Sequence, residues 1–381
     1  MTKNTIHDEK LIRVAFHSIP GLGSGRLRHI IAVFGSALKA WQAPEKDLKI
    51  LGGESWVNTL IQKRSQLDLI KVERELDQKE IQTVIPEEQH YPALLRELAD
   101  APPLLYYRGN LGPDERGIAI VGSRKSTPYG RAAAESLGKA IAQQGYAVVS
   151  GLARGIDTAA HKGALAGKGK TWAILGSGLD YIYPSENKKL AEQILLEGAL
   201  ISEFAPGVPP EPQFFPMRNR LISGVSEGVV VVEAALRSGA LITVDFALEQ
   251  GREVFAVPGP IFSEQSKGCH QLLRQGATLV EGAEDILSEL SEEFRVRVSP
   301  TGSKDTESVK QPGNLSLKQE EYSNEQLEIL SLMSDLPLHI DQIALQSSVN
   351  PSQIALLLLE LQLSGEIEQL SGQRYVLAHK C

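Results

Sequence analysis

The chain has 381 residues, 42% of them hydrophobic and 23% charged, which is enough for two or three domains with buried cores. This composition excludes collagen-like, low-complexity and disulfide-scaffold proteins. The net charge of −8 excludes a polycation that coats nucleic acid, so any site for a polyanion must be local. Residues 321–381 alone carry a net charge of −6, so this end of the chain suits a polyanion least.

Two cysteines, Cys269 and Cys381, are too few for a disulfide framework or a four-ligand zinc site. We expect neither a metal nor a cofactor. The N-terminus lacks the apolar segment of a signal peptide, and nowhere do 18 apolar residues run together. We therefore expect a cytoplasmic protein with reduced thiols and no membrane contact.

The first predicted domain, residues 1–84, is helical. Residues 11–35 have helical periodicity that is interrupted at Ile19-Pro20-Gly21-Leu22-Gly23, which predicts a helix, a tight turn and a second helix. Such a helix-hairpin-helix or SAM-like module can direct backbone N–H groups at a phosphate. The alternative is an ordinary glycine turn inside a small helical module.

Residues 85–290 predict an α/β domain, because short apolar runs alternate there with longer amphipathic segments. Seven such runs predict a doubly wound, mostly parallel, extended Rossmann-like sheet. The runs are residues 118–121, 147–149, 172–175, 199–201, 229–232, 254–257 and 277–280. In such sheets ligands bind outside the carboxyl ends of the strands, where this sequence has its Gly, Ser, Arg and Asn clusters.

The C-terminal part of the chain begins with a predicted linker, residues 291–320, which lacks periodicity and has balanced charges. Residues 321–381 follow with three short helical patterns and a predicted β-hairpin that turns at Ser371-Gly372. Helices followed by a hairpin are typical of a winged-helix domain.

The first strand of the predicted sheet leads into a glycine-rich turn, Gly122-Ser123-Arg124-Lys125-Ser126-Thr127-Pro128-Tyr129-Gly130, and a helix from about Pro128. Backbone N–H groups of such a turn and the helix N-terminus form an anion site, here reinforced by Arg124 and Lys125. Phosphate is the expected ligand. The turn is neither a dinucleotide fingerprint nor a Walker loop, which argues against NAD and ATP. The alternative is a capped helix whose glycines only make the turn.

A second cluster of polar residues follows the next strand. Arg154 lies between Gly151 and Gly155, where its guanidinium group can engage phosphate or stack on a base. We expect Asp157 to cap the following helix. Asp157 and His161 share a helix face, but no nucleophile accompanies them, so we expect His161 to be a packing or hydrogen-bonding residue.

A third cluster, Phe214-Phe215-Pro216-Met217-Arg218-Asn219-Arg220, combines two aromatic rings with two arginines and an amide. Rings that stack on bases and guanidinium groups that hold phosphates suit single-stranded nucleic acid. Phe214 could instead belong to the core. The segments Ser238-Gly239-Ala240-Leu241-Ile242-Thr243 and Pro258-Gly259 add backbone anion sites on the same edge of the sheet.

Five motifs in this order resemble the DNA-processing protein A family, also called DprA or Smf. They are Gly-Ser-Arg-x-x-Ser/Thr-x-Tyr-Gly at 122–130, Ser-Gly-x-Ala-x-Gly-Ile-Asp at 150–157, Phe-Pro-x-Arg-Asn-Arg at 215–220, Ser-Gly-x-Leu-Ile-Thr at 238–243 and Pro-Gly at 258–259. The resemblance extends to residues 91–95 and 102–109 and, with both flanking domains, covers nearly the whole chain.

The resemblance implies a cytoplasmic, homodimeric protein that binds and protects single-stranded DNA and loads RecA recombinase in natural transformation or homologous recombination, without catalytic turnover. It implies a dimer interface near residues 268–273, including Leu272 and Leu273. It also implies a single-stranded DNA site in which Phe214 or Phe215 stacks a base. The residues expected at that site are Gly122, Ser123, Arg124, Lys125, Ser126, Tyr129, Gly130, Gly151, Arg154, Gly155, Phe214, Phe215, Arg218, Asn219, Arg220, Ser238, Gly239, Thr243 and Gly259.

The presumed recognition helix of the winged-helix domain, residues 352–361, has no Lys or Arg, and only Arg374 and Lys380 are basic after residue 321. Because a winged helix that reads duplex DNA normally brings cations to the groove, we predict a protein-contact or spacer module instead.

Two other functions compete with the binding protein. One is an enzyme that hydrolyses nucleotides, as phosphoribohydrolases of related Rossmann-like folds do, with Glu233 or Asp245 as acid or base, although the loop at 238–243 does not match theirs. The other is a winged-helix transcription factor, which the lack of cations disfavours. The binding function predicts a strong salt dependence: six neutralised phosphates would give a slope of about −4 in a plot of log affinity against log salt.

Overall fold

The computed structural model describes residues 3–112, 115–297, 323–333, 338–340, 343, 347, 349, 351–364, 366–370 and 374–377. Internal contacts divide the chain into two compact units, residues 1–301 and residues 302–381. None of the helices in the described ranges is both long enough and apolar enough to cross a membrane.

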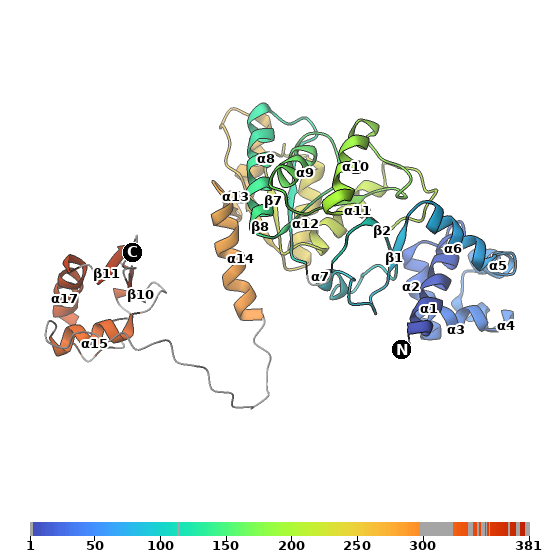
Figure 1. Cartoon of the computed structure of the whole chain (residues 1–381), viewed down its shortest axis with the longest axis horizontal. Coiled ribbons are helices and arrows are strands. Elements are labelled where there is room, and N and C mark those ends of the chain that lie inside the picture. The colour runs from blue at the N-terminus through green and yellow to red at the C-terminus, as the bar shows by residue number, and fades with distance from the viewer. Residues whose placement is uncertain are drawn as a thin grey trace. The chain divides into compact units, whose positions relative to one another are not determined.

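The first unit is built on a sheet that has nine strands in the described residues, in the order β1-β2-β6-β5-β4-β3-β7-β8-β9. Four of these strands, β1, β2, β7 and β8, are labelled in Figure 1. All seven predicted strands are confirmed as β3 to β9, and they run parallel to one another. Strands β1 and β2, which were not predicted, add antiparallel pairs beside β6. The strands are β1 Gln82–Val84, β2 Leu105–Gly109, β3 Gly117–Val121, β4 Ala147–Ser150, β5 Thr171–Leu175, β6 Ala199–Ser202, β7 Gly228–Val231, β8 Glu253–Ala256 and β9 Thr278–Leu279.

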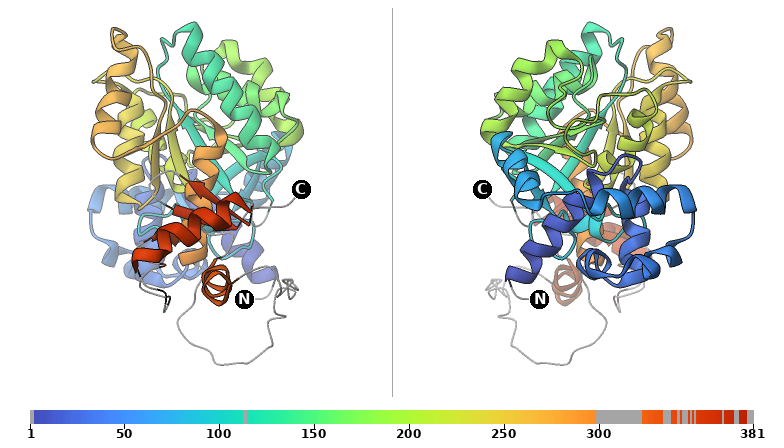
Figure 2. Two further views of the ribbon diagram at one scale, coloured as in Figure 1. Left: turned by 90° about the vertical axis from the view of Figure 1, so that its left-hand side faces the viewer. Right: turned by 90° about the vertical axis from the view of Figure 1, so that its right-hand side faces the viewer.

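Helices cover both faces of this sheet, as the side views in Figure 2 show. Successive side chains of a strand point to opposite faces, so Ile118 and Ile120 of β3 pack with α8, α9 and α14, whereas Ala119 and Val121 pack with α11, α12 and α13. The helices are α7 Ala93–Arg96, α8 Pro128–Gln143, α9 Ile156–Ala166, η2 Ser185–Asn187, α10 Lys188–Glu197, α11 Phe214–Gly224, α12 Gly239–Glu249, η3 Glu264–Ser266, α13 Lys267–Arg274 and α14 Ala283–Arg297. The expected doubly wound, Rossmann-like class is confirmed.

The N-terminal helices belong to the same compact unit as the sheet. The predicted helix, turn and helix are confirmed as α1 and α2, and Arg26 of α2 donates to the Gly21 carbonyl within the turn. Arg13 of α1 is buried, and its guanidinium group donates to Glu9, to Glu87 and to the Pro103 carbonyl. These helices are α1 Lys3–His17, α2 Ser24–Phe34, α3 Ala37–Gln42, α4 Glu45–Leu48, η1 Lys49–Leu51, α5 Glu54–Arg64 and α6 Leu69–Gln78.

The predicted linker is shorter than residues 291–320, because the backbone of α14 remains helical as far as Arg297. Residues 283–297 contain neither Pro nor Gly, and the first proline follows at Pro300, so nothing in this stretch interrupts the helix earlier. The rest of the predicted linker lies outside the described residues.

The second unit contains the elements of a winged helix. Its strands form a small antiparallel sheet in the order β10-β12-β11, and the predicted hairpin is confirmed as β11 paired with β12. The predicted turn at Ser371-Gly372 and part of the helical patterns lie outside the described residues. The elements are α15 Asn324–Leu332, β10 Leu338–His339, α17 Pro351–Leu363, β11 Ile367–Leu370 and β12 Arg374–Leu377.

Candidate nucleic-acid interface

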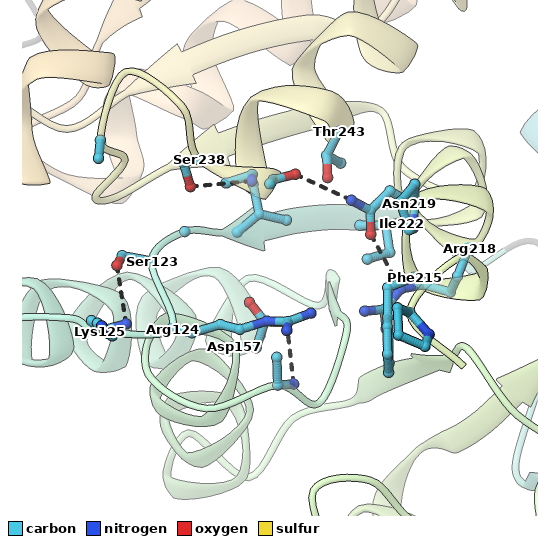
Figure 3. A pocket seen from close by; sticks show the side chains of 18 of the residues that line it. Ser123, Arg124, Lys125, Asp157, Phe215, Arg218, Asn219, Ile222, Ser238 and Thr243 are labelled. Carbon is cyan, nitrogen blue, oxygen red and sulfur yellow. Dashed lines mark hydrogen bonds between the residues drawn. The ribbon is translucent and has the colours of Figure 1, made fainter. Parts of the chain in front are cut away.

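A cavity of about 600 Å³ opens at the carboxyl ends of β3 and β7 (Figure 3). The order of the parallel strands reverses between these two neighbours, and such a switch point is where doubly wound sheets bind ligands. The walls come from the loop after β3, the loop before α9, the first turns of α11 and the start of α12. A volume of this size suits a nucleotide-sized ligand.

The loop after β3 forms one wall of this cavity. Thr127 caps α8, because its hydroxyl group accepts from the Gly130 N–H at 3.1 Å, so the predicted helix start at Pro128 is confirmed. The Ser123 hydroxyl accepts from the Lys125 N–H at 3.1 Å. These bonds hold Arg124 and Lys125 at the tip of the loop, where both are exposed and neither has an ion-pair partner among the described residues.

Glu233, two residues after the end of β7, holds the loop after β3 in place. The buried carboxylate accepts from the Thr127 N–H at 2.8 Å and from the Thr127 hydroxyl group. A Cβ atom at Gly130 would collide with the same carboxylate, which explains the glycine. Both oxygens of Glu233 are thus engaged in holding the loop.

Phe215 supplies the aromatic surface of the cavity. The guanidinium carbon of Arg124 lies 5.2 Å from the centre of its ring, and the Tyr183 ring lies 5.5 Å away on centroids. Figure 3 shows Arg124 reaching across the cavity toward Phe215. Phe214 instead packs its ring on Phe204 at 4.5 Å and does not line the cavity. The structure therefore distinguishes the two phenylalanines that the sequence left equivalent.

Arg218 forms the floor of the cavity and is only 3% exposed. Its Nη1 donates to the carbonyl of Gly151 at 2.7 Å and to the carbonyl of Ile174. Burial lowers the pKa of Arg218 to about 10, although the nearby Asp157 carboxylate acts in the opposite direction. A Cβ atom at Gly151 would strike the guanidinium group, so glycine is required there. Most donors of Arg218 are thus occupied by the protein itself.

Asp157 lies beside Arg218, and its predicted role as a helix cap is wrong. The N-cap of α9 is Gly155, and Asp157 in the first turn accepts from the N–H groups of Gly151 and Ala153 at 3.2 and 3.3 Å. It thus fixes the preceding loop, which has a sharp turn with φ of 79° at Gly155. Burial raises the pKa of Asp157.

His161, one turn further along α9, is fully buried, and its Nδ1 lies 2.6 Å from the Thr171 hydroxyl. The expected packing and hydrogen-bonding role of His161 is confirmed.

Two of the expected arginines are already paired with acids. The exposed Arg154 lines a smaller neighbouring cavity and binds Glu186 through Nε and Nη2, both at 2.8 Å. Arg220 points away from both cavities and binds Glu203 and Asp100, with 13% of its side chain exposed. Arg220 thus joins α11 to distant parts of the chain.

The structure sorts the expected site residues into three groups. The larger cavity is lined by Gly122, Ser123, Arg124, Lys125, Phe215, Arg218, Asn219, Ser238, Gly239 and Thr243, and the smaller one by Gly151, Arg154, Arg124, Phe215 and Arg218. Neither cavity is lined by Ser126, Tyr129, Gly130, Gly155, Phe214, Arg220 or Gly259. Among them, Tyr129 supports a neighbouring loop by donating to the Pro258 carbonyl at 2.9 Å.

The cavity is also lined by residues that were not predicted, among them Tyr183 and Gln265. Tyr183 lies between β5 and η2, outside the motifs described above. Gln265 lies in η3, which follows β8, and no sequence signal marks it.

The residues expected at a dimer interface lie on α13. Leu272 is buried in the sheet core, whereas Leu273 is only partly buried. The neighbouring β9 is an edge strand of the sheet.

The fold and the cavity define a Rossmann-like protein with two exposed cations, Arg124 and Lys125, at a cavity on the edge of its sheet, followed by a winged helix. Residues 82–291 match the model of the family described as DNA recombination-mediator protein A, and residues 316–373 match the DprA winged helix domain. The chain belongs to the DNA recombination-mediator protein A family.

Curated relatives that match the chain agree with this family assignment. The chain is 32% identical to Protein Smf of Synechocystis over 97% of its own length and 99% of the relative. It is 46% identical to DNA processing protein DprA of Streptococcus pneumoniae over 52% of its length and 71% of the relative.

Two solved structures are similar. The X-ray structure of DprA from Streptococcus pneumoniae has a TM-score of 0.64 at 35% identity, covering 74% of this chain and 97% of that one. The structure of DNA processing protein A from Helicobacter pylori, described for its single-stranded DNA binding mode, has a TM-score of 0.50 at 28% identity, covering 56% and 97%.

Proposed function

We propose that this chain binds single-stranded DNA at the carboxyl edge of its sheet and passes it to RecA recombinase, without catalytic turnover. The observation that carries the proposal is the pair formed by Arg124 and Phe215, a cation without an acidic partner among the described residues on an aromatic ring at a nucleotide-sized cavity. Bases stack on such rings while guanidinium groups hold phosphates. The Helicobacter pylori relative, described for binding single-stranded DNA, supports the same ligand.

Transfer to RecA, protection of the strand, homodimerisation and a cytoplasmic setting form the wider part of this proposal. The description of the family as a recombination mediator supports the transfer to a recombinase, and the other three are what the resemblance to the family implies. The absence of turnover is supported by Glu233, whose oxygens are occupied by Thr127, and by Asp245, which does not line either cavity. These two acids were the candidates for hydrolysis.

The test measures binding of a fluorescent 30-mer, single-stranded and duplex, to the full chain across a salt series. We expect a preference for the single strand and a steep fall of affinity with salt. Arg124→Ala should weaken binding about tenfold, because it removes both a phosphate contact and the ring contact. Lys139→Ala is the matched control, since Lys139 is an exposed cation near the other end of α8.

A flat salt response, or equal affinity of the wild type and Arg124→Ala, would contradict the proposal. Release of free base from a nucleotide by the wild type, lost in Glu233→Ala, would support the hydrolase instead.

A further inference from the structure

A two-residue turn stands at the rim of the larger cavity. The Ser238 N–H donates to the Ala235 carbonyl at 3.0 Å, which closes a tight turn with Leu236 and Arg237 at its tip. Ala235 and Ser238 both line the cavity, so the tip rises directly beside it. Arg237 is exposed and has no hydrogen-bond or ion-pair partner among the residues that the structure describes.

A second turn has an unusual composition. The Ser263 N–H donates to the Pro260 carbonyl at 3.0 Å, which places Ile261 and Phe262 at the tip. Ile261 is 74% exposed and Phe262 is 93% exposed, although turn positions favour Gly, Asn, Asp and Ser. Neither side chain stabilises the fold by burial, so their apolar surface is available to a ligand.

The second turn is anchored at its start. The Tyr129 hydroxyl donates to the Pro258 carbonyl at 2.9 Å, and the His270 Nε2 lies 3.0 Å from the Gly259 carbonyl. The Phe262 ring is therefore presented on a fixed backbone, which lowers the entropy cost of stacking on it.

Both turns rise from one rim. The Ala234 N–H donates to the Gln265 carbonyl and the Gly268 N–H donates to the Ala234 carbonyl, each at 2.7 Å, so the segments that carry the turns are bonded to each other. Gln265 lines the cavity, and three residues of extended chain place the Phe262 Cα atom within about 11 Å of the Gln265 Cα atom.

We propose that these two turns, the rim turns, extend the single-stranded DNA site beyond the cavity. Phe262 stacks on a base of the strand that leaves the cavity, and Arg237 holds a phosphate of the same strand. This inference rests on the proposed function and adds to it residues that the family motifs do not include.

Charge and position favour DNA over a protein partner on this surface. An exposed cation and an exposed aromatic ring, carried by two hydrogen-bonded segments at the rim of one cavity, match the alternation of phosphate and base along a single strand. Glu264, the carboxylate nearest in sequence to Phe262, forms an ion pair with Lys267, so it repels the DNA strand less than a free carboxylate would.

The experiment compares binding of a 30-mer and of a 5′-phosphorylated dinucleotide to the full chain. Phe262→Ala should weaken binding of the 30-mer about tenfold, which corresponds to one lost stacking contact. Phe262→Tyr should bind like the wild type, and Phe262→Leu should bind like Phe262→Ala, because only the ring matters. All three should bind the dinucleotide like the wild type, since the cavity is intact.

Arg237→Ala should weaken binding of the 30-mer about threefold and reduce the salt slope by about 0.7, the contribution of one phosphate on a single strand. Leu196→Ala is the control for an exposed apolar side chain elsewhere, because Leu196 is 78% exposed on α10.

The possible outcomes separate the role of the rim turns from the proposed function. Wild-type affinity for the 30-mer in both Phe262→Ala and Arg237→Ala would overturn the inference that the rim turns bind DNA, and would leave the proposed function unaffected. No binding of any single strand by the wild type would overturn both. A lower molar mass of Phe262→Ala by light scattering, with unchanged DNA affinity, would assign this surface to a second copy of the chain and overturn the inference.

Discussion

The carboxyl edge of the sheet, where we propose that DNA binds, and helix α17, the helix by which other winged helices read DNA, differ in charge. Loops at the sheet edge present Arg124 and Lys125 to a cavity, whereas Pro351–Leu363 contains no Lys or Arg. On α17 the exposed Glu360 carboxylate even accepts from the Gln326 amide at 2.9 Å. Because binding to the phosphate backbone relies on cations, we expect this winged helix not to bind DNA, although the same fold binds DNA in other proteins.

This difference in charge follows from how many side chains each element buries in the core of its unit. On α17, Ile354, Leu357, Leu358 and Leu361 are buried, which ties the helix to packing. Loops at strand ends bury little of their own side chains and can present cations without loss of core. We therefore keep the prediction that the winged helix is a protein-contact or spacer module.

Separating the two units should produce the largest effect. We expect residues 1–301 to bind the single-stranded 30-mer within about threefold of the full chain, and residues 302–381 to bind single-stranded or duplex DNA at least about a hundredfold more weakly. Fluorescence anisotropy measures both, with circular dichroism to verify folding. Micromolar binding of duplex DNA by a 321–381 fragment would contradict the prediction that the winged helix is a protein-contact or spacer module.

Within the sheet edge, two arginines should respond differently to the same substitution. Arg218→Met should lower the free energy of unfolding by about 3 kcal/mol, because the Gly151 and Ile174 carbonyls lose their donor and Asp157 loses its cation. Arg124→Met should change stability by less than about 0.5 kcal/mol and weaken DNA binding about tenfold. Urea unfolding and anisotropy separate the two. Full stability of Arg218→Met with lost binding would make Arg218 a direct ligand instead.

Acidification should destabilise the unit that carries the sheet edge. Burial lowers the pKa of His17 to about 4 and that of His161 to about 3, so both are neutral in the folded chain. The unfolded chain takes up protons at these histidines below about pH 6.5, and stability is lost as the pH falls from there toward 4. From pH 7.5 to 5.5 the two histidines should lower the free energy of unfolding by about 2 to 3 kcal/mol.

Urea titrations followed by tryptophan fluorescence measure this loss, because Trp41, Trp56 and Trp172 all lie in the first unit. The variant with His17→Gln and His161→Gln is the control and should lose most of the pH dependence. A wild type equally stable at both pH values would refute the burial argument.

The smallest effect is expected at Arg154, whose guanidinium group must leave Glu186 before it can hold a phosphate. Glu186→Gln should tighten binding of the single-stranded 30-mer about two- to threefold, since exposed ion pairs are weak. Glu192→Gln, the same change on the exposed surface of α10, should have little effect. Weaker binding by Glu186→Gln would show that Arg154 needs Glu186 for its orientation.

The sequence by itself determined the seven parallel strands, the N-terminal helix pair, the hairpin of the winged helix and the loops that carry the site. These features depend on local patterns. Apolar runs such as residues 229–232 form buried strands, and Thr127 before Pro128 starts a helix whatever the distant parts of the chain do. The missed strand β2 has no such apolar run, because it ends in an arginine and a glycine. Its antiparallel place beside β6 depends on partners 90 to 96 residues away.

Only the tertiary structure decided which members of the motifs face the cavity. Phe215 rather than Phe214 lies beside Arg124, Arg218 turns inward to two carbonyls, and Arg220 finds Glu203 and Asp100. Adjacent residues with the same chemistry differ here because helix α11 rotates each one by about 100° from the previous one. What each side chain then meets is set by strands and loops that are distant in sequence, and no local pattern encodes those contacts.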